Sequence, residues 1–92
     1  MSVVHIPTPL RPYTGEQARV EVAGATVGEV LEALLARHSG LAQHLRDDRG
    51  RLRSFVNIYV GEEDIRFLEQ EATVVGAESE ITIVPSIAGG AA

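Results

Sequence analysis

Residues 26–40 carry the clearest structural signal in this chain, the pattern of one amphipathic helix. Thr26 and Glu29 form a capping box, in which the threonine hydroxyl accepts a hydrogen bond from a free amide and the glutamate reaches back. Gly40 is expected to close the helix in a left-handed conformation. A helix with one apolar face must bury that face against another element, so the flanking segments decide the fold class. The apolar face consists of Val27, Val30, Leu31, Leu34 and Leu35.

Two β segments precede this helix. Residues 3–10 mix β-branched residues with Pro7 and Pro9, and these prolines restrict where a strand can pair because they donate no ladder hydrogen bond. Residues 12–15 have turn chemistry. Residues 18–23 alternate valines with charged residues, which is typical of a half-buried strand. The two segments are therefore predicted to form a hairpin.

The segments after the helix predict two or three further strands. We expect a helical turn at 41–45, a loop at 47–50, a strand at 55–60, a turn at 61–64 leading into a short piece at 65–67, a turn at 76–80 and a last strand at 81–87. The inward-facing strand positions are Val20, Val22, Val56, Ile58, Val60, Ile81 and Ile83. The order ββαβ(β)β predicts an α+β domain, with one main helix on a mixed sheet of four to five strands. It is compatible with a β-grasp (ubiquitin-like) fold over residues 1–87, followed by a flexible C-terminal tail at 88–92.

Composition excludes several classes of function. The chain has no cysteine, which rules out a disulfide framework, a zinc–thiolate site and a thiol nucleophile. Its formal charge of −5 argues against a nucleic-acid partner. No apolar run approaches the roughly 20 residues that span a bilayer, and the first residues lack the pattern of a secretory signal. We therefore expect a cytoplasmic protein with no membrane partner.

All eight basic residues are arginine and none is lysine. A GC-rich genome that replaces lysine codons with arginine codons would explain this. Avoidance of self-acylation would also explain it, because a carrier with an activated C-terminus should lack nearby amines. Both explanations stay open at the level of sequence.

The usual catalytic and metal-binding residues show no site pattern. His38 and His44 are six residues apart across a glycine, which is not the spacing of zinc ligands, and His5 is far from both in the sequence. Residues 62–64 are acidic but lack the alternating ligand spacing of a calcium loop, so we expect a solvated turn there. We predict no catalytic residue and no metal site in the folded body.

The C-terminal residues are the exception. Pro85 donates no ladder bond and is expected to help separate the chain from the sheet. Gly89 and Gly90 carry no Cβ, so a partner enzyme could thread the tail through a narrow channel. A frayed terminus is the alternative interpretation, because Gly-Gly is common near chain ends.

Three segments together resemble the ThiS/MoaD family of prokaryotic ubiquitin-like sulfur carriers: residues 55–60 (FVNIYV), 63–67 (EDIRF) and 82–90 (TIVPSIAGG). The likeness covers nearly the whole chain and is greatest to the carriers of an alternative cysteine-synthesis route. It implies a β-grasp fold and an active terminal glycine carboxylate. An E1-like enzyme would adenylate that carboxylate with ATP, and sulfur would then replace the AMP to give a thiocarboxylate.

The resemblance also assigns roles by position. Gly90 would carry the adenylate and then the thiocarboxylate. The tail residues threaded into a partner would be Pro85, Ile87, Ala88 and Gly89, and the residues that dock partners would be Val84 and Ile87. The implied partners are the E1-like adenylating enzyme, a PLP-dependent cysteine-synthase-like enzyme and a JAMM-type zinc metalloprotease. The chain itself would be a carrier, not an enzyme, with no bound cofactor, since ATP is used by the activating enzyme.

One departure from the family is that Ala91 and Ala92 follow the diglycine. Short extensions in the family are removed by the metalloprotease, which makes the Gly90–Ala91 bond a predicted processing site. A degenerate or artificial end is the alternative.

The first functional hypothesis is a sulfur carrier for cysteine synthesis, with molybdopterin synthesis as its nearest variant. The second is a ubiquitin-like modifier joined through Gly90 to lysines of other proteins, and the third is an interaction module with an inert tail.

Overall fold

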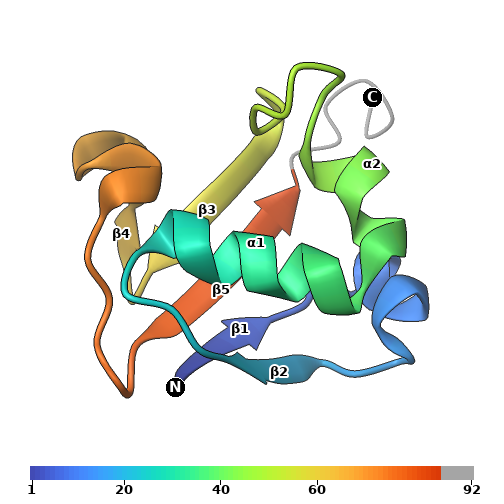
Figure 1. The fold of residues 1–92 in the computed structure, drawn as a ribbon, viewed down its shortest axis with the longest axis horizontal. Helices are drawn as coiled ribbons and strands as arrows, with labels where there is room; N and C mark the ends of the chain where they lie inside the picture. Colours follow the sequence, from blue (N-terminus) through green and yellow to red (C-terminus); the bar gives the residue numbers. More distant parts are fainter. Residues whose placement is uncertain (86–92) are drawn as a thin grey trace.

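The computed structural model of this 92-residue chain describes residues 1–85. The elements in chain order are β1 (Ser2–His5), the 3₁₀ segment η1 (Thr8–Thr14), β2 (Arg19–Val22), α1 (Val27–Arg37), η2 (Ser39–Leu41), α2 (Ala42–Leu45), β3 (Val56–Val60), β4 (Glu63–Asp64), η3 (Ile65–Phe67), η4 (Gln70–Ala72) and β5 (Glu80–Pro85) (Figure 1). This is the predicted order of strands around one main helix, with the additional short strand present.

The five strands form one mixed sheet in the order β2-β1-β5-β3-β4 (Figure 1). β1 and β5 lie side by side in the middle and run parallel, and the other neighbours run antiparallel. β5 pairs with β3 from Ile81 opposite Val60 to Pro85 opposite Val56. β1 pairs with Glu80–Thr82, so the C-terminal half of β5 is paired with β3 alone.

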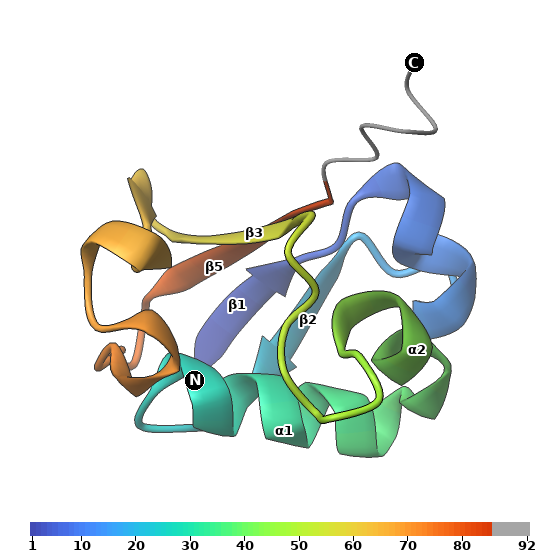
Figure 2. The same ribbon diagram turned by 90° about the horizontal axis from the view of Figure 1, so that it is seen from above.

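α1 covers one face of this sheet and leaves the other face open (Figure 2). Strand side chains alternate between the two faces, so one set lies beneath the helix. The predicted helix residues Val27, Val30, Leu31 and Leu34 are at most 1% exposed, whereas Leu35 is only partly buried at the margin of the core. Predicted strand residues in the core are Val20, Val22, Val56, Ile58, Ile81 and Ile83, with Val60 packed against them.

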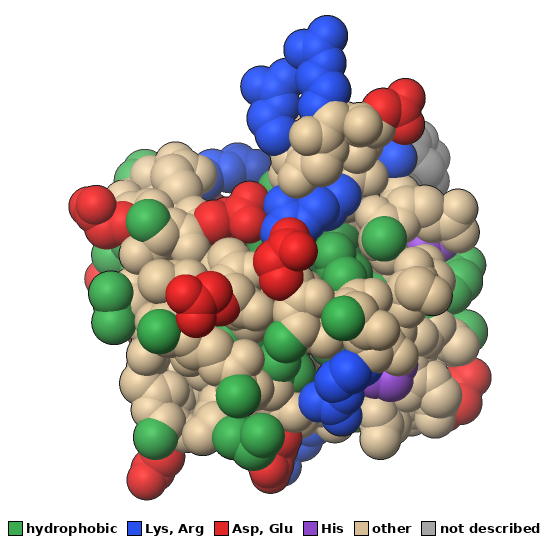
Figure 3. All heavy atoms as spheres, in the orientation of Figure 1, with side chains coloured by type: hydrophobic (Ala, Val, Ile, Leu, Met, Phe, Trp, Pro, Cys, Tyr) green, Lys and Arg blue, Asp and Glu red, His purple; other side chains and the backbone are tan. Residues whose placement is uncertain are grey.

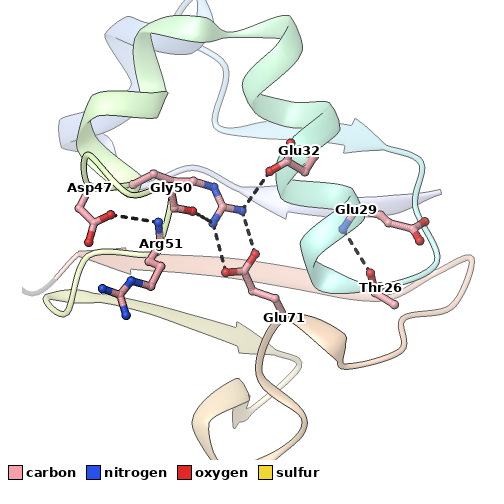
Figure 4. A network of polar contacts seen from close by, with 8 residues as sticks. Thr26, Glu29, Glu32, Asp47, Gly50, Arg51 and Glu71 are labelled. Atoms are coloured by element: carbon pink, nitrogen blue, oxygen red, sulfur yellow. Dashed lines mark hydrogen bonds and ion pairs between the residues drawn. The ribbon is translucent and has the colours of Figure 1, made fainter.

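The start of α1 follows the predicted capping box with one difference. Thr26 Oγ1 accepts a hydrogen bond from the Glu29 amide at 3.2 Å (Figure 4). Glu29 Oε1 accepts from the Ala25 amide at 3.0 Å, one residue before the cap. Both contacts give a hydrogen-bond acceptor to an amide that has no partner within the helix. The negative charge of Glu29 is also favourable near the positive end of the helix dipole.

The predicted strand at 3–10 is too long. β1 ends at His5, and the chain passes into η1, which has Pro9 at its second position. Proline fits the first turn of a helix because amides there have no intrahelical partner. Leu10 is still buried, but a helical turn carries it into the core. The predicted turn at 12–15 forms the end of η1.

The prediction that Gly40 closes the main helix is wrong. α1 ends at Arg37, and the amide of the capping residue His38 donates to the Leu34 carbonyl at 2.9 Å. Gly40 lies in the following turn, η2, where a Cβ would approach Tyr13 Cδ1 to 3.2 Å. A side chain here would crowd Tyr13, and the Gly40 backbone is not left-handed. The helical turn predicted at 41–45 is present as the end of η2 and α2.

The strand bounds near the C-terminus also differ from the prediction. β5 begins at Glu80, which we placed in the preceding turn, and its predicted continuation to Ile87 lies outside the described residues. The turn predicted at 61–64 contains the short strand β4, in which Glu63 pairs with Val60. Gly61 makes this reversal with a φ of 63°, a conformation that glycine adopts without steric cost.

Leu34→Ala is expected to lower the free energy of unfolding by roughly 2–5 kcal/mol, because truncation of a fully buried leucine loses apolar contact and leaves a cavity. Leu35→Ala is the matched control and should cost less, since Leu35 is only partly buried. Urea unfolding followed by circular dichroism measures both. Equal costs for the two variants would contradict this packing.

Candidate functional site

The chain leaves the sheet at the C-terminal end of β5. Pro85 is the last residue of this strand and stands opposite Val56, the first residue of β3. Proline has no amide hydrogen, so the ladder gains no donor at this position. We call this end of β5 the tail exit. Of the predicted site residues, Val84 and Pro85 are placed, and Ile87, Ala88, Gly89, Gly90 and Ala91 lie outside the described residues.

The open face of the sheet borders the tail exit (Figure 2). Val84 stands opposite Asn57 of β3 and is 39% exposed, whereas the preceding Ile83 is 1% exposed. This alternation assigns Val84 to the face away from α1. On the same face, His5 Nε2 pairs with Glu80 Oε1 at 2.7 Å. The predicted docking residue Val84 therefore lies on an uncovered surface of mixed character.

A groove of about 450 Å³ follows the end of β5. One wall contains Pro85, and the other contains Pro7 and Pro9 from the segment that follows β1. Arg11 also lines the groove, and its Nε donates to the Ile6 carbonyl at 3.0 Å. This hydrogen bond fixes one cation beside a largely apolar channel.

The other side of the tail exit is basic. Residues 46–53 contain four arginines and lead toward β3, and we call them the arginine loop. Figure 3 shows basic side chains projecting from the upper part of the molecule, over the segment between α2 and β3. Arg66 adds to this region, because its Nη2 donates to the Ser54 carbonyl at 2.9 Å. A hollow of about 320 Å³ is lined by both Arg53 and Arg66.

Two sets of contacts hold the arginine loop in place (Figure 4). The Arg46 guanidinium makes a bidentate pair with Glu71, with Nη2–Oε1 at 2.8 Å and Nη1–Oε2 at 3.1 Å. The hydrogen bond to Glu71 raises the pKa of Arg46 against the opposing effect of burial. Asp47 Oδ1 accepts from the amides of Arg49 (2.9 Å) and Arg51 (3.0 Å). The Arg51 and Arg49 amides lower the pKa of Asp47, because they stabilise its charged form.

The acidic residues and histidines make packing and capping contacts. Among residues 1–85, no group of three Asp, Glu or His side chains is close enough together to hold a metal ion. Asp64, in the predicted acidic turn, accepts from the Arg66 amide at 2.9 Å and caps η3. The His44 ring lies against Tyr13, with ring centroids 4.4 Å apart. The Nε2 atoms of His38 and His44 are buried and have no hydrogen-bond partner in the part of the chain that the structure describes.

The described part of the chain is thus suited to presenting a segment to another molecule. The tail exit lies at the end of the β3–β5 ladder, between an apolar groove and a basic loop. Within residues 1–85, no helix is long and apolar enough to cross a membrane.

The model of the ThiS family matches residues 4–90. This chain belongs to the ThiS family. It is 46% identical over 89 residues to the sulfur carrier protein CysO of Mycobacterium tuberculosis and of Mycobacterium bovis, with 95% of this chain and 96% of each relative covered. It is also 35% identical over 66 residues to small archaeal modifier protein 3 of Haloferax volcanii, with 72% of this chain and 71% of that protein covered.

Solved structures agree with this assignment. The crystal structure of Mycobacterium tuberculosis CysO has a TM-score of 0.86 at 43% identity and covers 94% of this chain and 99% of that one. The Amycolatopsis orientalis BexX/CysO complex gives 0.88 at 39% identity, with 98% and 100% covered. Small archaeal modifier protein 1 of Methanosarcina acetivorans gives 0.86 at 26% identity, with 97% and 95% covered. The predicted α+β, ubiquitin-like β-grasp fold is confirmed, and the CysO homologues are carrier proteins rather than enzymes.

The sequence predictions missed the surroundings of the tail exit. The groove requires Arg11 and Pro85 to be neighbours, and only the parallel pairing of β1 with β5 brings them together. The arginine loop did leave a signal, the alternating basic residues Arg49, Arg51 and Arg53. Its position beside the exit could not be read from that pattern, because it depends on the register of β3 with β5.

Asp47→Ala is expected to reduce stability at neutral pH and to remove part of the acid sensitivity of the fold. The pKa of Asp47 is lowered in the folded state, so its stabilising effect is present above the unfolded value of about 4 and is lost as pH falls through the folded value. The urea midpoints of parent and variant should therefore converge below about pH 4. Asp48→Ala, at the exposed neighbouring position, is the control. Parallel pH profiles for the parent and Asp47→Ala would contradict the role of this carboxylate.

Proposed function

We propose that this chain is a sulfur carrier protein that bears a thiocarboxylate on Gly90 and delivers sulfur for cysteine biosynthesis. The observation that carries the proposal is a family match that runs to Gly90 in a chain 46% identical to CysO sulfur carriers over nearly its whole length. An E1-like adenylating enzyme, a PLP-dependent cysteine-synthase-like enzyme and a JAMM-type zinc metalloprotease would act on it. The carrier would bind no cofactor, ATP being used by the activating enzyme, and these steps would take place in the cytoplasm.

The chemistry follows from the low reactivity of a carboxylate. The Gly90 carboxylate would attack the α-phosphate of ATP, releasing pyrophosphate and leaving an acyl adenylate. A sulfur nucleophile would then attack the carbonyl carbon, form a C–S bond and expel AMP. The chain has no cysteine, so the terminal carbonyl group, rather than a side-chain thiol, would hold the sulfur.

The activating enzyme would recognise the body at the tail exit. Exposed Val84 and the apolar groove beside Pro85 provide surface whose burial favours association. Arg11 provides a fixed cation at the same place. Beyond the exit, Ile87, Ala88 and Gly89 would enter the enzyme's channel, where the missing Cβ of glycine allows close approach.

Removal of Ala91 and Ala92 would precede activation. The ThiS match ends at Gly90, whose carboxyl group lies in a peptide bond in the encoded chain. Activation at Ala92 would displace the diglycine by two residues, roughly 7 Å in an extended chain. Such an offset defeats positioning, since about 1 Å of misplacement can cost about a hundredfold in rate.

Protein modification is the second candidate function. The observation that favours it is the similarity to small archaeal modifier proteins, 35% identity to one and a TM-score of 0.86 to another. In that case Gly90 would be joined to lysine amines of other proteins and would have no sulfur role. Molybdopterin synthesis is the nearest variant of the sulfur-carrier function, with a different acceptor for the same thiocarboxylate.

We expect the cognate E1-like enzyme to adenylate a chain that ends at Gly90 but not the full 92-residue chain. ATP–pyrophosphate exchange measures this step, and intact mass shows whether Ala91 and Ala92 remain. Gly90→Val in the shortened chain is the control, because a branched side chain restricts the backbone and should block entry into a channel shaped for glycine. Equal activity of the full and shortened chains, with both alanines retained, would show that trimming is not required.

Incubation of the thiocarboxylate form with an activated serine held by the PLP-dependent enzyme should give a carrier–cysteine adduct. The thiocarboxylate sulfur would bond to the serine Cβ as the activated oxygen leaves, and an S-to-N acyl shift would leave cysteine amide-linked to Gly90. A zinc metalloprotease would release it with metal-activated water. Mass spectrometry of the intact carrier detects the adduct. Recovery of Gly90 on lysines of other proteins, with no cysteine adduct, would support the modifier function instead.

A further inference from the structure

We infer that the arginines around the tail exit keep an activated Gly90 from acylating its own protein. The inference rests on the proposed activation of this residue. An acyl adenylate reacts with an unprotonated amine that can reach it, and lysine supplies such an amine. Guanidinium remains protonated and does not act as an acyl acceptor, so arginine can supply positive charge without a nucleophile. In this role the arginines determine the specificity of acyl transfer.

Three of these arginines flank the exit. Arg11 lines the same groove as Pro85. Arg53 and Arg66 line the hollow on the other side together with Val56, and Val56 is the cross-strand partner of Pro85. Neighbouring strands are about 4.8 Å apart. The side chains of Arg53 and Arg66, which lie beyond β3, are therefore about two strand spacings, on the order of 10 Å, from Pro85.

The tail is long enough to return to these positions. Gly90 is five residues beyond Pro85, and an extended chain spans about 3.3–3.6 Å per residue, which gives a reach of roughly 17 Å. An amine within that radius would be tethered to the activated carbonyl. Short flexible tethers give effective concentrations on the order of millimolar, far above the concentration of a partner protein in solution. Lysine at these positions would therefore compete directly with the intended acceptor.

The amino group of Met1 lies at the opposite end of the sheet (Figure 1). β1 is parallel to β5, and Val3 pairs with Glu80 at the start of β5. The Met1 amine donates to the Ala77 carbonyl at 2.8 Å in this region. β5 spans roughly 17 Å from Glu80 to Pro85, and Met1 lies two residues before Val3, so the amine is about 23 Å from the tail exit and beyond the roughly 17 Å that the tail can span. Parallel pairing thus sets this amine apart from the activated end.

The side reaction would remove the carrier from use. A lysine Nζ would attack the Gly90 carbonyl carbon, an N–C bond would form, and the C–O bond to AMP would break. AMP would leave with the electron pair, and the amine proton would pass to water. The product would be a closed loop that is lighter than the free acid by one water and has no terminal carboxyl group left to load with sulfur.

The test uses the chain ending at Gly90 as a C-terminal thioester of a small alkyl thiol, prepared without any activating enzyme. Arg66→Lys and Arg53→Lys each place an amine near the exit at unchanged charge. Glu78→Lys places one at the exposed turn before β5 and is the distant control. At pH 8, both arginine variants should lose the thioester several-fold faster than the parent, independently of protein concentration, and yield the product lighter by one water. Glu78→Lys should hydrolyse like the parent.

Circular dichroism establishes which variants are folded, and either folded arginine variant is sufficient for the test. Hydrolysis alone in the folded variants, at the parent rate, overturns the inference. Equal loop closure in Glu78→Lys also overturns it, because position would then not matter. Adenylation of the parent by the cognate enzyme is measured separately. Its failure would refute the proposed function and would leave the thioester result unchanged.

Discussion

The parallel pairing of β1 with β5 is the contact on which both the core and the tail exit depend. Val4 stands opposite Ile81 in this pairing, and both side chains are fully buried beneath α1. Because the two strands run in the same direction, the segment that follows β1 lies at the end where β5 finishes. That segment supplies the proline wall of the groove and Arg11. Antiparallel pairing with β3 places the arginine loop on the other side of the same exit.

Local patterns predicted the elements whose causes are local. The capping box at Thr26 and the apolar spacing along α1 involve residues within a few turns of one another, and the structure confirms both. The errors arose where distant residues decide the outcome. Gly40 does not end α1, which stops at Arg37, and its close neighbour is Tyr13 from a distant segment. The segment after His5 leaves the sheet because its prolines suit a helical turn as well as they limit a strand.

The tail and its surroundings were predictable to different degrees. The diglycine is visible in the sequence because two adjacent residues without side chains stand out, and resemblance to a family gave them a role. The groove and the arginine loop have no comparable signature. The pair that anchors the loop joins Arg46 to Glu71, 25 residues apart, and neither residue stands out in a sequence rich in both types. Such contacts follow from the assembled sheet and cannot be inferred from spacing.

The arginines at the exit also carry a structural role that bears on why lysine is absent there. Arg11, Arg53 and Arg66 each donate to a main-chain carbonyl, at 3.0, 2.9 and 2.9 Å. The planar guanidinium has five donors in a fixed fork, so one donor can brace the backbone while others face a partner. A lysine ammonium is a single mobile point of charge and would hold these loops less firmly. Arg37 and Arg46 also donate to main-chain carbonyls, so what distinguishes these three arginines is that they flank the tail exit. At the exit, the side chain that best supports the fold is also the one that an activated carbonyl does not modify.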